Sequence, residues 1–347
     1  MNKKLKTNTF YNTKGEKSSV ERMIIGGNPT GFKDYDDIKY HWTESLRKRM
    51  QGNTWFPSEV DTSKDKYDYL NKLNDKERDA FDKALSQLIF MDSLQTESVS
   101  RLIPFITAPE IQGLLVRQDF EEDLHTESYF VLIRDISVNK DKIKELWRTN
   151  EHLMKKNEKL AKVYNDFFDN PTEENFVKML FANQILEGIY FYSGFTYIYS
   201  LGFYKNAMPG AVEMIRFINR DENTHLELFR NIINSLYDER PDLFTEKLKL
   251  EVVQMFKEAV ELETDWGVYI GEGGLLGMTK TKISEFNKYR ANQILYGVRK
   301  VGIPKIYAEV KNPFEWVNAY STPNSAKQNF FETTVTDYSK GSIEMDF

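Results

Sequence analysis

The chain has 347 residues, of which 40% are hydrophobic and 29% charged, and it contains no cysteine. Its net charge of −6 disfavours nucleic acid or an anionic membrane as the main partner, because both require a basic surface. The lack of cysteine excludes disulfides, thiolate metal sites and thiol chemistry performed by this chain. With only 18 Gly and 10 Pro, the composition favours long helices over a sandwich with many turns.

Residues 1–19 are polar and rich in lysine, with no apolar segment, so no secretory signal is expected and the chain should be cytoplasmic. We interpret residues 1–20 as a polar N-terminal arm. The most apolar stretch, residues 185–203, has the length of a membrane span. Because it contains Glu187 and several tyrosines, a buried core helix is the favoured interpretation.

Apolar periodicity predicts helices through most of residues 36–300. Thr107 and Asn170 are expected to cap two of them, since each lies just before a proline and a long amphipathic run. The predicted helices span residues 36–51, 75–102, 108–137, 141–168, 171–202, 209–237, 244–269 and 279–299. Their lengths predict an all-α helical bundle that occupies residues 21–322 as one domain. Residues 323–347 are polar and lack this periodicity, so we expect a flexible tail.

Two of the four histidines follow a glutamate by three residues, in Glu122-Asp123-Leu124-His125 and Glu222-Asn223-Thr224-His225. Residues three apart on a helix share one face, so each pair can bind the same metal ion. A single acid in an apolar helix precedes each pair, Asp92 before the first and Glu187 before the second. The chain therefore contains a coarse internal repeat.

A dinuclear carboxylate site in a four-helix bundle takes one acid from each of two helices and a Glu-x-x-His pair from each of the other two. The candidate ligands are Asp92, Glu122, His125, Glu187, Glu222 and His225. Oxygen and nitrogen ligands without thiolates suit iron or manganese, and two such ions can supply electrons to dioxygen. Either lone acid could instead face solvent or a polar core network, but the two Glu-x-x-His pairs disfavour that interpretation. His41 and His152 lack such an acid and are expected to be surface or structural residues.

Tyr129 lies four residues after His125 and seven after Glu122, so its phenol should approach the metal pair. The apolar side chains expected to surround the phenol are Phe191, Phe195 and Ile218. Core packing alone would explain such a stripe of apolar residues. Beside a metal site, a shielded redox tyrosine is the better explanation.

Four segments match one known family in the right order. They are Phe90-Met91-Asp92-Ser93-Leu94-Gln95, Glu122-Asp123-Leu124-His125-Thr126-Glu127-Ser128-Tyr129, Leu186-Glu187-Gly188-Ile189 and Arg220-Asp221-Glu222-Asn223-Thr224-His225. From about Trp55 to the C-terminus, the chain resembles the small, radical-generating subunit of class I ribonucleotide reductase, a ferritin-like bundle. In that family a dimetal centre reacts with dioxygen and oxidises a tyrosine to a stable radical. The large subunit, which supplies the thiols, uses this radical to reduce ribonucleotides to deoxyribonucleotides.

The resemblance implies that the six candidate ligands bind two iron ions, with manganese as the alternative. It implies that Tyr129 is the radical site, that Trp55 is the family's buried tryptophan, and that Asp221 links this tryptophan to the metal bound by His125. Tyr338 resembles the tyrosine that passes the radical across the subunit interface. The tail, residues 323–347, would dock to the large subunit through its acidic, aromatic end, and the chain would form a homodimer.

Two other classes of protein share the metal motif. A ferritin-like dimetal oxidase acting on a lipid or small molecule would need a substrate cavity beside the metals. A metal-storage or structural bundle would have no use for Trp55 or the tail. A tyrosyl-radical signal from the metal-loaded protein would separate these three functions.

Overall fold

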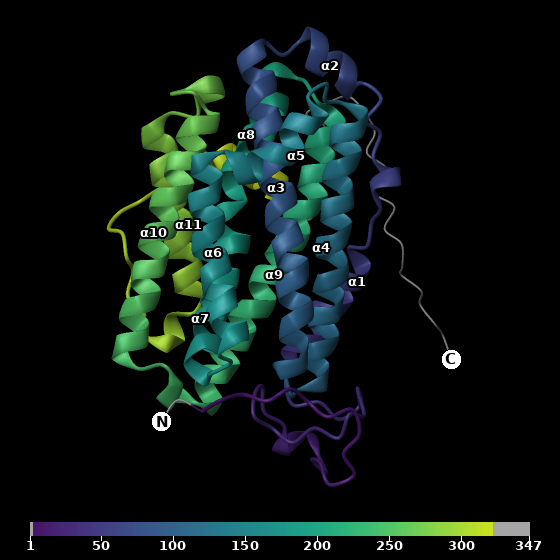
Figure 1. Ribbon diagram of the computed structural model, residues 1–347, viewed down its shortest axis with the longest axis vertical. Coiled ribbons are helices and arrows are strands. Elements are labelled where there is room, and N and C mark those ends of the chain that lie inside the picture. The colour runs from purple at the N-terminus through teal and green to yellow at the C-terminus, as the bar shows by residue number, and fades with distance from the viewer. Residues whose placement is uncertain (1–2, 322–347) are drawn as a thin grey trace.

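The computed structural model describes residues 3–321, in which long helices pack side by side (Figure 1). Four helical columns carry the six predicted ligands. They are α3 (Asp75–Leu102), α4 (Pro109–Asp135), α9 (Pro209–Glu239), and a column made of α7 (Glu173–Ile185), η4 (Leu186–Tyr190) and α8 (Tyr192–Lys205). Residues 3–321 contain no β-strand, only the isolated bridges Lys4–Thr172 and Ile25–Ile106. The predicted all-α bundle is confirmed.

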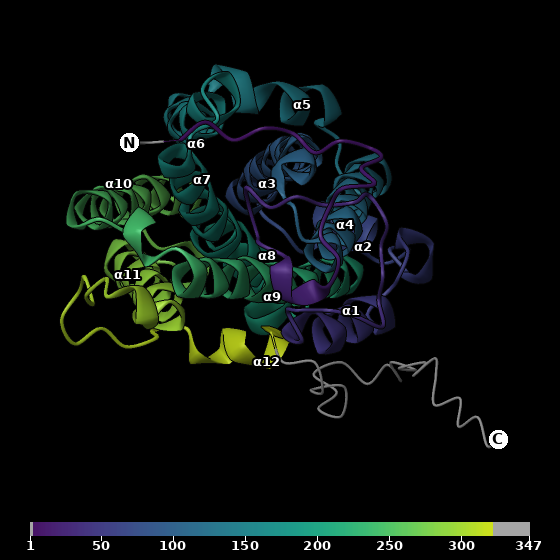
Figure 2. The same ribbon diagram turned by 90° about the horizontal axis from the view of Figure 1, so that it is seen from below.

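The remaining helices surround these columns. Figure 2 shows α10 and α11 on one side of α7 and α8, and α1 on the other side of the bundle, against α4 and α9. Their bounds are α1 (Trp42–Gly52), α2 (Asp65–Asn71), α5 (Lys140–Thr149), α6 (Glu151–Asp169), α10 (Glu246–Ile270), α11 (Lys280–Gly297) and α12 (Asn318–Ser321). Short 3₁₀ turns are η1 (Ser19–Glu21), η2 (Pro57–Glu59), η3 (Ile103–Phe105), η5 (Pro241–Leu243), η6 (Leu275–Gly277), η7 (Arg299–Val301) and η8 (Glu315–Val317).

The α7–α8 column runs through the protein interior. Every residue from 181 to 202 is buried, so this column is covered by other helices on all sides. The interpretation of residues 185–203 as a core helix is therefore confirmed. Among the described helices, none combines the length and apolar character that a membrane crossing requires.

The first predicted helix, residues 36–51, starts later than periodicity suggested, at Trp42. The backbone N–H groups of Lys39 and Tyr40 donate to Glu110 Oε1, at 3.0 and 3.4 Å. This buried carboxylate holds the preceding segment against α4. The N-terminal arm also contacts the bundle, because the N–H of Leu5 donates to the Pro171 carbonyl at 2.6 Å.

The predicted helix 141–168 is broken at Asn150, which has extended backbone angles (φ −96°, ψ 122°). Its side-chain oxygen accepts hydrogen bonds from the N–H groups of His152 and Leu153, at 3.1 and 3.3 Å. Asparagine is a strong N-cap, so α6 starts anew after it. The apolar pattern continues across the break, which is why periodicity did not reveal it.

Both predicted capping residues were wrong. Thr172 rather than Asn170 caps α7, since its hydroxyl accepts from the N–H of Asn175 at 3.3 Å. Helix α4 begins at Pro109 without a side-chain cap. The hydroxyl of Thr107 bonds instead to the N-terminal segment, where it accepts from the Gly27 N–H at 3.2 Å.

The start of α9 is fixed by two carboxylates from α2. Asp65 accepts from the N–H of Gly210 at 3.0 Å, and Asp68 accepts from the N–H of Met208 at 3.0 Å. A side chain at position 210 would place its Cβ 2.5 Å from the carbonyl oxygen of Asp61, so glycine permits this close approach. These contacts set the axial position of the helix that carries Glu222 and His225.

Candidate metal centre

The six predicted ligands converge in the middle of the bundle. Each of them is fully buried, with 0% of its surface exposed. Their potential ligand atoms form two groups, and within each group these atoms lie within 4.8 Å of one another. One group is Asp92, Glu122, His125 and Glu222, and the other is Glu122, Glu187, Glu222 and His225. Because Glu122 and Glu222 belong to both groups, the arrangement is suited to two ions with bridging carboxylates.

Both histidines turn Nδ1 toward the acids. The Nδ1 atom of His125 lies 3.0 Å from Glu222 Oε1 and 3.8 Å from Asp92 Oδ2. The Nδ1 atom of His225 lies 3.0 Å from Glu222 Oε2 and 3.1 Å from Glu122 Oε1. The Nε2 atoms then face away from this cluster, toward two further carboxylates.

Several buried polar atoms of this cluster have no hydrogen-bond partner within the described part of the chain. They include both carboxylate oxygens of Asp92 and one oxygen each of Glu122 and Glu187. Burial and the neighbouring acids raise the pKa of Asp92 and of Glu187. Buried carboxyl groups that have a raised pKa and oxygens without hydrogen-bond partners are expected at a cation-binding site.

Outside the cluster, Asp221 connects His125 to Trp55. Its Oδ2 atom lies 3.5 Å from His125 Nε2 and accepts a hydrogen bond from Trp55 Nε1 at 2.7 Å. The Trp55 indole stacks on the His125 imidazole, with ring centroids 6.5 Å apart and planes at 25°. Asp221 thus lies between the Trp55 indole and the His125 imidazole.

Glu121 provides an equivalent connection that the sequence analysis missed. Its Oε2 atom lies 2.9 Å from His225 Nε2, and its Oε1 accepts from Arg117 Nε at 2.8 Å. Glu121 directly precedes Glu122 in the same way as Asp221 precedes Glu222. Each helix therefore supplies, one residue before the glutamate that both groups share, the acid that lies beside the histidine of the other helix. This shared position in the internal repeat was the available signal.

The loop that carries Trp55 is attached to both helices. Arg117 Nη2 donates to the hydroxyl of Thr54 at 2.9 Å. From the other helix, Arg220 donates to the carbonyl of Asn53 and lies 3.3 Å from Asp221 Oδ1. Glu121 and Asp221, the two acids outside the ligand cluster, are thus each paired with an arginine that also bonds this loop. This arrangement fixes the indole relative to the ligands.

Two glutamines, also missed from sequence, orient the carboxylates. Gln118 Nε2 donates to Glu122 Oε1 at 2.8 Å and to Glu187 Oε1 at 3.0 Å. Gln95 Nε2 donates to the same oxygen of Glu187 at 2.6 Å, and Gln95 Oε1 accepts from the Tyr164 hydroxyl at 3.1 Å. The second oxygen of Glu187 has no hydrogen-bond partner among the described residues. Gln118 precedes Glu122 by one helical turn, which places it on the ligand face.

Tyr129 is fully buried on the same helix as Glu122 and His125. Burial raises the pKa of its phenol, and the negative charges of Asp92 and Glu222 raise it further. The phenol is therefore protonated at neutral pH. Asp92 is the carboxylate whose charge acts on it most strongly.

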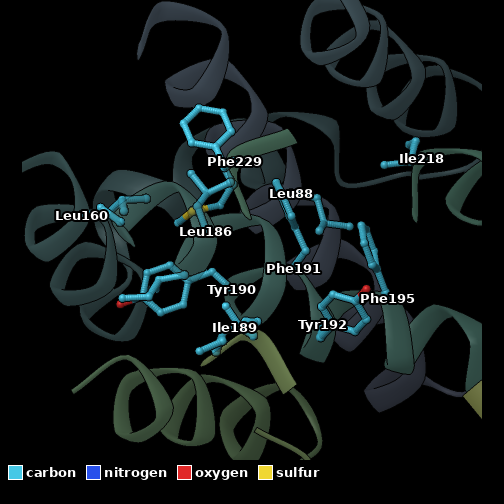
Figure 3. Packing of buried hydrophobic residues seen from close by; sticks show 14 of the residues in the cluster. Leu88, Leu160, Leu186, Ile189, Tyr190, Phe191, Tyr192, Phe195, Ile218 and Phe229 are labelled. Atoms are coloured by element: carbon cyan, nitrogen blue, oxygen red, sulfur yellow. The ribbon is translucent and has the colours of Figure 1, made fainter. Parts of the chain in front are cut away.

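The three side chains predicted to surround the Tyr129 phenol are all fully buried. Phe191 and Phe195 stack with centroids 5.5 Å apart and planes at 12°, and Figure 3 shows them near Leu88. Ile218 lies apart from this pair in the same view. The shielding of Tyr129 by these residues stays a prediction.

The two remaining histidines are not part of the ligand cluster. His41 is exposed next to the start of α1, and His152 is half-buried and stacks on Tyr269 with centroids 4.6 Å apart. Neither histidine belongs to the two ligand groups found in residues 3–321. Tyr338 and the predicted tail lie outside the described residues.

Comparison with known proteins identifies the family. Residues 33–313 match the family model for the ribonucleotide reductase small chain. A ribonucleoside-diphosphate reductase subunit beta from Treponema pallidum is 36% identical over 99% of this chain and 97% of its own length. Its counterpart from Halalkalibacterium halodurans is 33% identical over 99% of this chain and 98% of its own length.

A solved structure agrees with these matches. The ribonucleotide reductase R2 subunit from Clostridium botulinum is 36% identical, has a TM-score of 0.87, and covers 92% of this chain and 100% of its own. The resemblance inferred from the four sequence segments is thereby confirmed. The chain belongs to the ribonucleotide reductase small-chain family.

Proposed function

We propose that this chain generates the radical for a class I ribonucleoside-diphosphate reductase, at a dinuclear metal centre beside Tyr129. The observation that carries the proposal is the pair of overlapping ligand groups joined by Glu122 and Glu222. A storage site would not require a buried tyrosine on the ligand helix, and the family relationship supports the reductase over a different dimetal oxidase.

The residues present fit two divalent cations. Four acids buried together repel one another, and their unpartnered oxygens have lost hydration without compensation. Two cations would provide both charge compensation and ligand bonds. Carboxylates and imidazoles without thiolates favour iron or manganese, of which iron is our first choice. Asp92 and His125 would bind one ion, Glu187 and His225 the other, and Glu122 and Glu222 both.

When bound, two such ions would supply electrons to dioxygen, and this chemistry would provide the oxidising power that Tyr129 requires. Because the phenol is protonated, its oxidation also requires the loss of a proton. Asp92 is the acid best situated to accept it. The surrounding apolar core keeps water and reductants away from the phenoxyl oxygen.

The outer residues would serve orientation and radical transfer. Asp221 and Glu121 each hold the Nε2 of one histidine, which keeps Nδ1 directed at an ion. Trp55 has an oxidisable indole ring, which donates a hydrogen bond to Asp221 and stacks on the candidate ligand His125. We propose that it starts the route by which the radical leaves the small subunit.

The partner is the large subunit, which would be engaged through residues 323–347, with Tyr338 as the relay at the interface. A homodimer is also proposed. An exposed apolar stripe on α4, formed by Val116, Phe120 and Phe130, supports it, since such a stripe is suited to burial against a second copy. Sedimentation equilibrium of the purified chain measures this state.

Loading with ferrous iron, followed by dioxygen, tests the proposed function. We expect two iron ions per chain and an electron paramagnetic resonance signal from a tyrosyl radical. A parallel preparation with Mn²⁺ decides between the two metals. A protein that binds two ions and gives no radical with either metal would be a storage protein or a different oxidase.

Asp92→Ala is expected to empty one metal position. Asp92 has two unpartnered oxygens in the site, and its loss removes a ligand specific to the His125 ion. Metal content should fall from two ions toward one. Glu97→Ala is the control, because Glu97 lies on the same helix with its side chain 69% exposed. Full occupancy of both positions in Asp92→Ala would show that the first ligand is misassigned.

The two outer acids should act on opposite ions. Glu121→Ala is expected to weaken the ion held by His225 about 10–100-fold, and Asp221→Ala the ion held by His125 by a similar factor. Titration with Mn²⁺ gives the affinities, and anomalous diffraction shows which position is depleted. Asp123→Ala, exposed and next to Glu122, is the control. Depletion of the same position by both variants would contradict the crossed arrangement.

A further inference from the structure

The segment that carries Glu187 is irregular. Leu186–Tyr190 forms a π-helical turn, with backbone hydrogen bonds to the fifth residue instead of the fourth. Such a turn contains one extra residue and leaves local backbone groups without their usual helical partners. Within this turn, the carbonyl of Gly188 accepts from Arg290 Nε of α11 at 2.9 Å. The irregular turn is therefore supported from outside.

A buried ion pair supports the end of the turn. Lys156 of α6 and Glu263 of α10 form this pair, and both side chains are 0% exposed. Lys156 Nζ also donates to the carbonyl of Tyr190 at 3.1 Å. Glu263 Oε1 accepts from the N–H of Ser193 at 3.1 Å. The pair thus bonds one backbone acceptor and one backbone donor on either side of the junction with α8.

Gln87 of α3 completes the support. Its amide nitrogen donates to the Tyr190 carbonyl, and its amide oxygen accepts from Trp266 Nε1 of α10. The Tyr190 carbonyl therefore has two side-chain donors from two helices. All the groups involved belong to helices that surround the α7–α8 column.

Stability alone does not explain a buried pair of this kind. Burial lowers the pKa of Lys156 and raises that of Glu263, although each partner opposes the effect on the other. Replacing a buried ion pair by apolar residues is often neutral or stabilising. The position of the pair, with both charges bonded to the backbone of the irregular turn, indicates a geometric role.

We propose that Lys156 and Glu263 are positioning residues that hold the π-helical turn and thereby aim Glu187 at the metal centre. The proposal rests on the proposed function, since it assumes that Glu187 binds an ion. If the turn relaxed to a regular α-helix, the register would shift by one residue. One residue corresponds to about 100° of rotation, so Glu187 and the Phe191–Phe195 pair could not both keep their present directions.

The experiment compares the unaltered chain with Lys156→Met/Glu263→Leu, which removes both charges together and keeps the volume apolar. Hydrogen exchange of residues 186–193, followed by mass spectrometry, reports on the turn. We expect these amides to exchange at least about tenfold faster in the variant, while Tm stays equal or rises. Faster local exchange without a lower Tm is not the result of a general loss of stability.

Lys159→Met/Glu258→Leu is the matched control. This pair joins the same two helices, but its side chains are 58% and 38% exposed and its Nζ–Oε2 distance is 3.2 Å. Surface pairs contribute little, so we expect no change in exchange within residues 186–193. Equal acceleration in the control would overturn the proposal.

Binding of Mn²⁺ gives the second readout. In the buried-pair variant, the ion ligated by Glu187 and His225 should bind about tenfold more weakly, while the ion ligated by Asp92 and His125 is retained. Unchanged exchange and unchanged Mn²⁺ affinity would overturn the proposal. So would a variant that fails to fold, because the pair would then serve stability. If the unaltered chain binds no Mn²⁺ or Fe²⁺, the proposed function fails, whereas the exchange result still decides whether the pair holds the turn.

Discussion

Tyr129→Phe is expected to abolish the radical signal while the metal content stays near two ions per chain. Phenylalanine keeps the shape of the ring but has no phenolic hydroxyl and is far harder to oxidise. The fold should tolerate the change, because phenylalanine fills the space of the buried tyrosine ring. Electron paramagnetic resonance after loading with ferrous iron and dioxygen measures the result.

Tyr197→Phe is the matched control. Tyr197 is equally buried, and its hydroxyl donates to the backbone carbonyl of Glu77 at 2.7 Å. Its removal should cost about 1 kcal/mol of stability through the lost hydrogen bond and leave the radical unchanged. An undiminished signal in Tyr129→Phe would assign the radical to another residue.

Deletion of residues 326–347 is expected to abolish binding to the large subunit and all ribonucleotide reduction. The dimetal centre and the Tyr129 radical should survive, because all six candidate ligands and the helices that carry them lie within residues 75–239. Loss of the radical in the truncated chain would contradict a separate tail. Binding is measured with the isolated large subunit, and the radical by spectroscopy.

Tyr338→Phe should act more narrowly, preserving binding while stopping turnover. Phenylalanine keeps the shape of the tyrosine ring, so binding to the large subunit should be retained. It has no phenolic proton and is far harder to oxidise, so it cannot relay the radical. Ser339→Ala, the adjacent change, should retain turnover. Substantial turnover by Tyr338→Phe with its cognate large subunit would exclude Tyr338 as the relay.

Spacing on helices explains why so much of the centre could be predicted. The i, i+3 pairs and the lone acids in apolar helices place Asp92, Glu122, His125 and Glu187 on inward faces wherever the exact helix ends lie. Bonds between distant elements leave no such periodic trace. The contact of Glu121 with His225 joins α4 to α9, and it could be suspected only from the internal repeat.

For a similar reason, hydrophobic periodicity could not predict where the helices are irregular or broken. The π-helical turn at Leu186–Tyr190 depends on side chains from four other helices, so residues 171–202 looked like one continuous helix. The break at Asn150 depends on a cap within an uninterrupted apolar pattern. Periodicity reports which residues are inside, whereas capping and tertiary bonds decide where a helix bends or stops.

Two metal ions are expected to share the carboxylates of Glu122 and Glu222. Anomalous diffraction from crystals loaded with ferrous iron under anaerobic conditions, collected on both sides of the iron absorption edge, tests this expectation most directly. We expect two peaks per chain, one beside Asp92 and His125 and the other beside Glu187 and His225, with the two shared glutamates between them. A single peak, or a second peak away from Glu187 and His225, would contradict it.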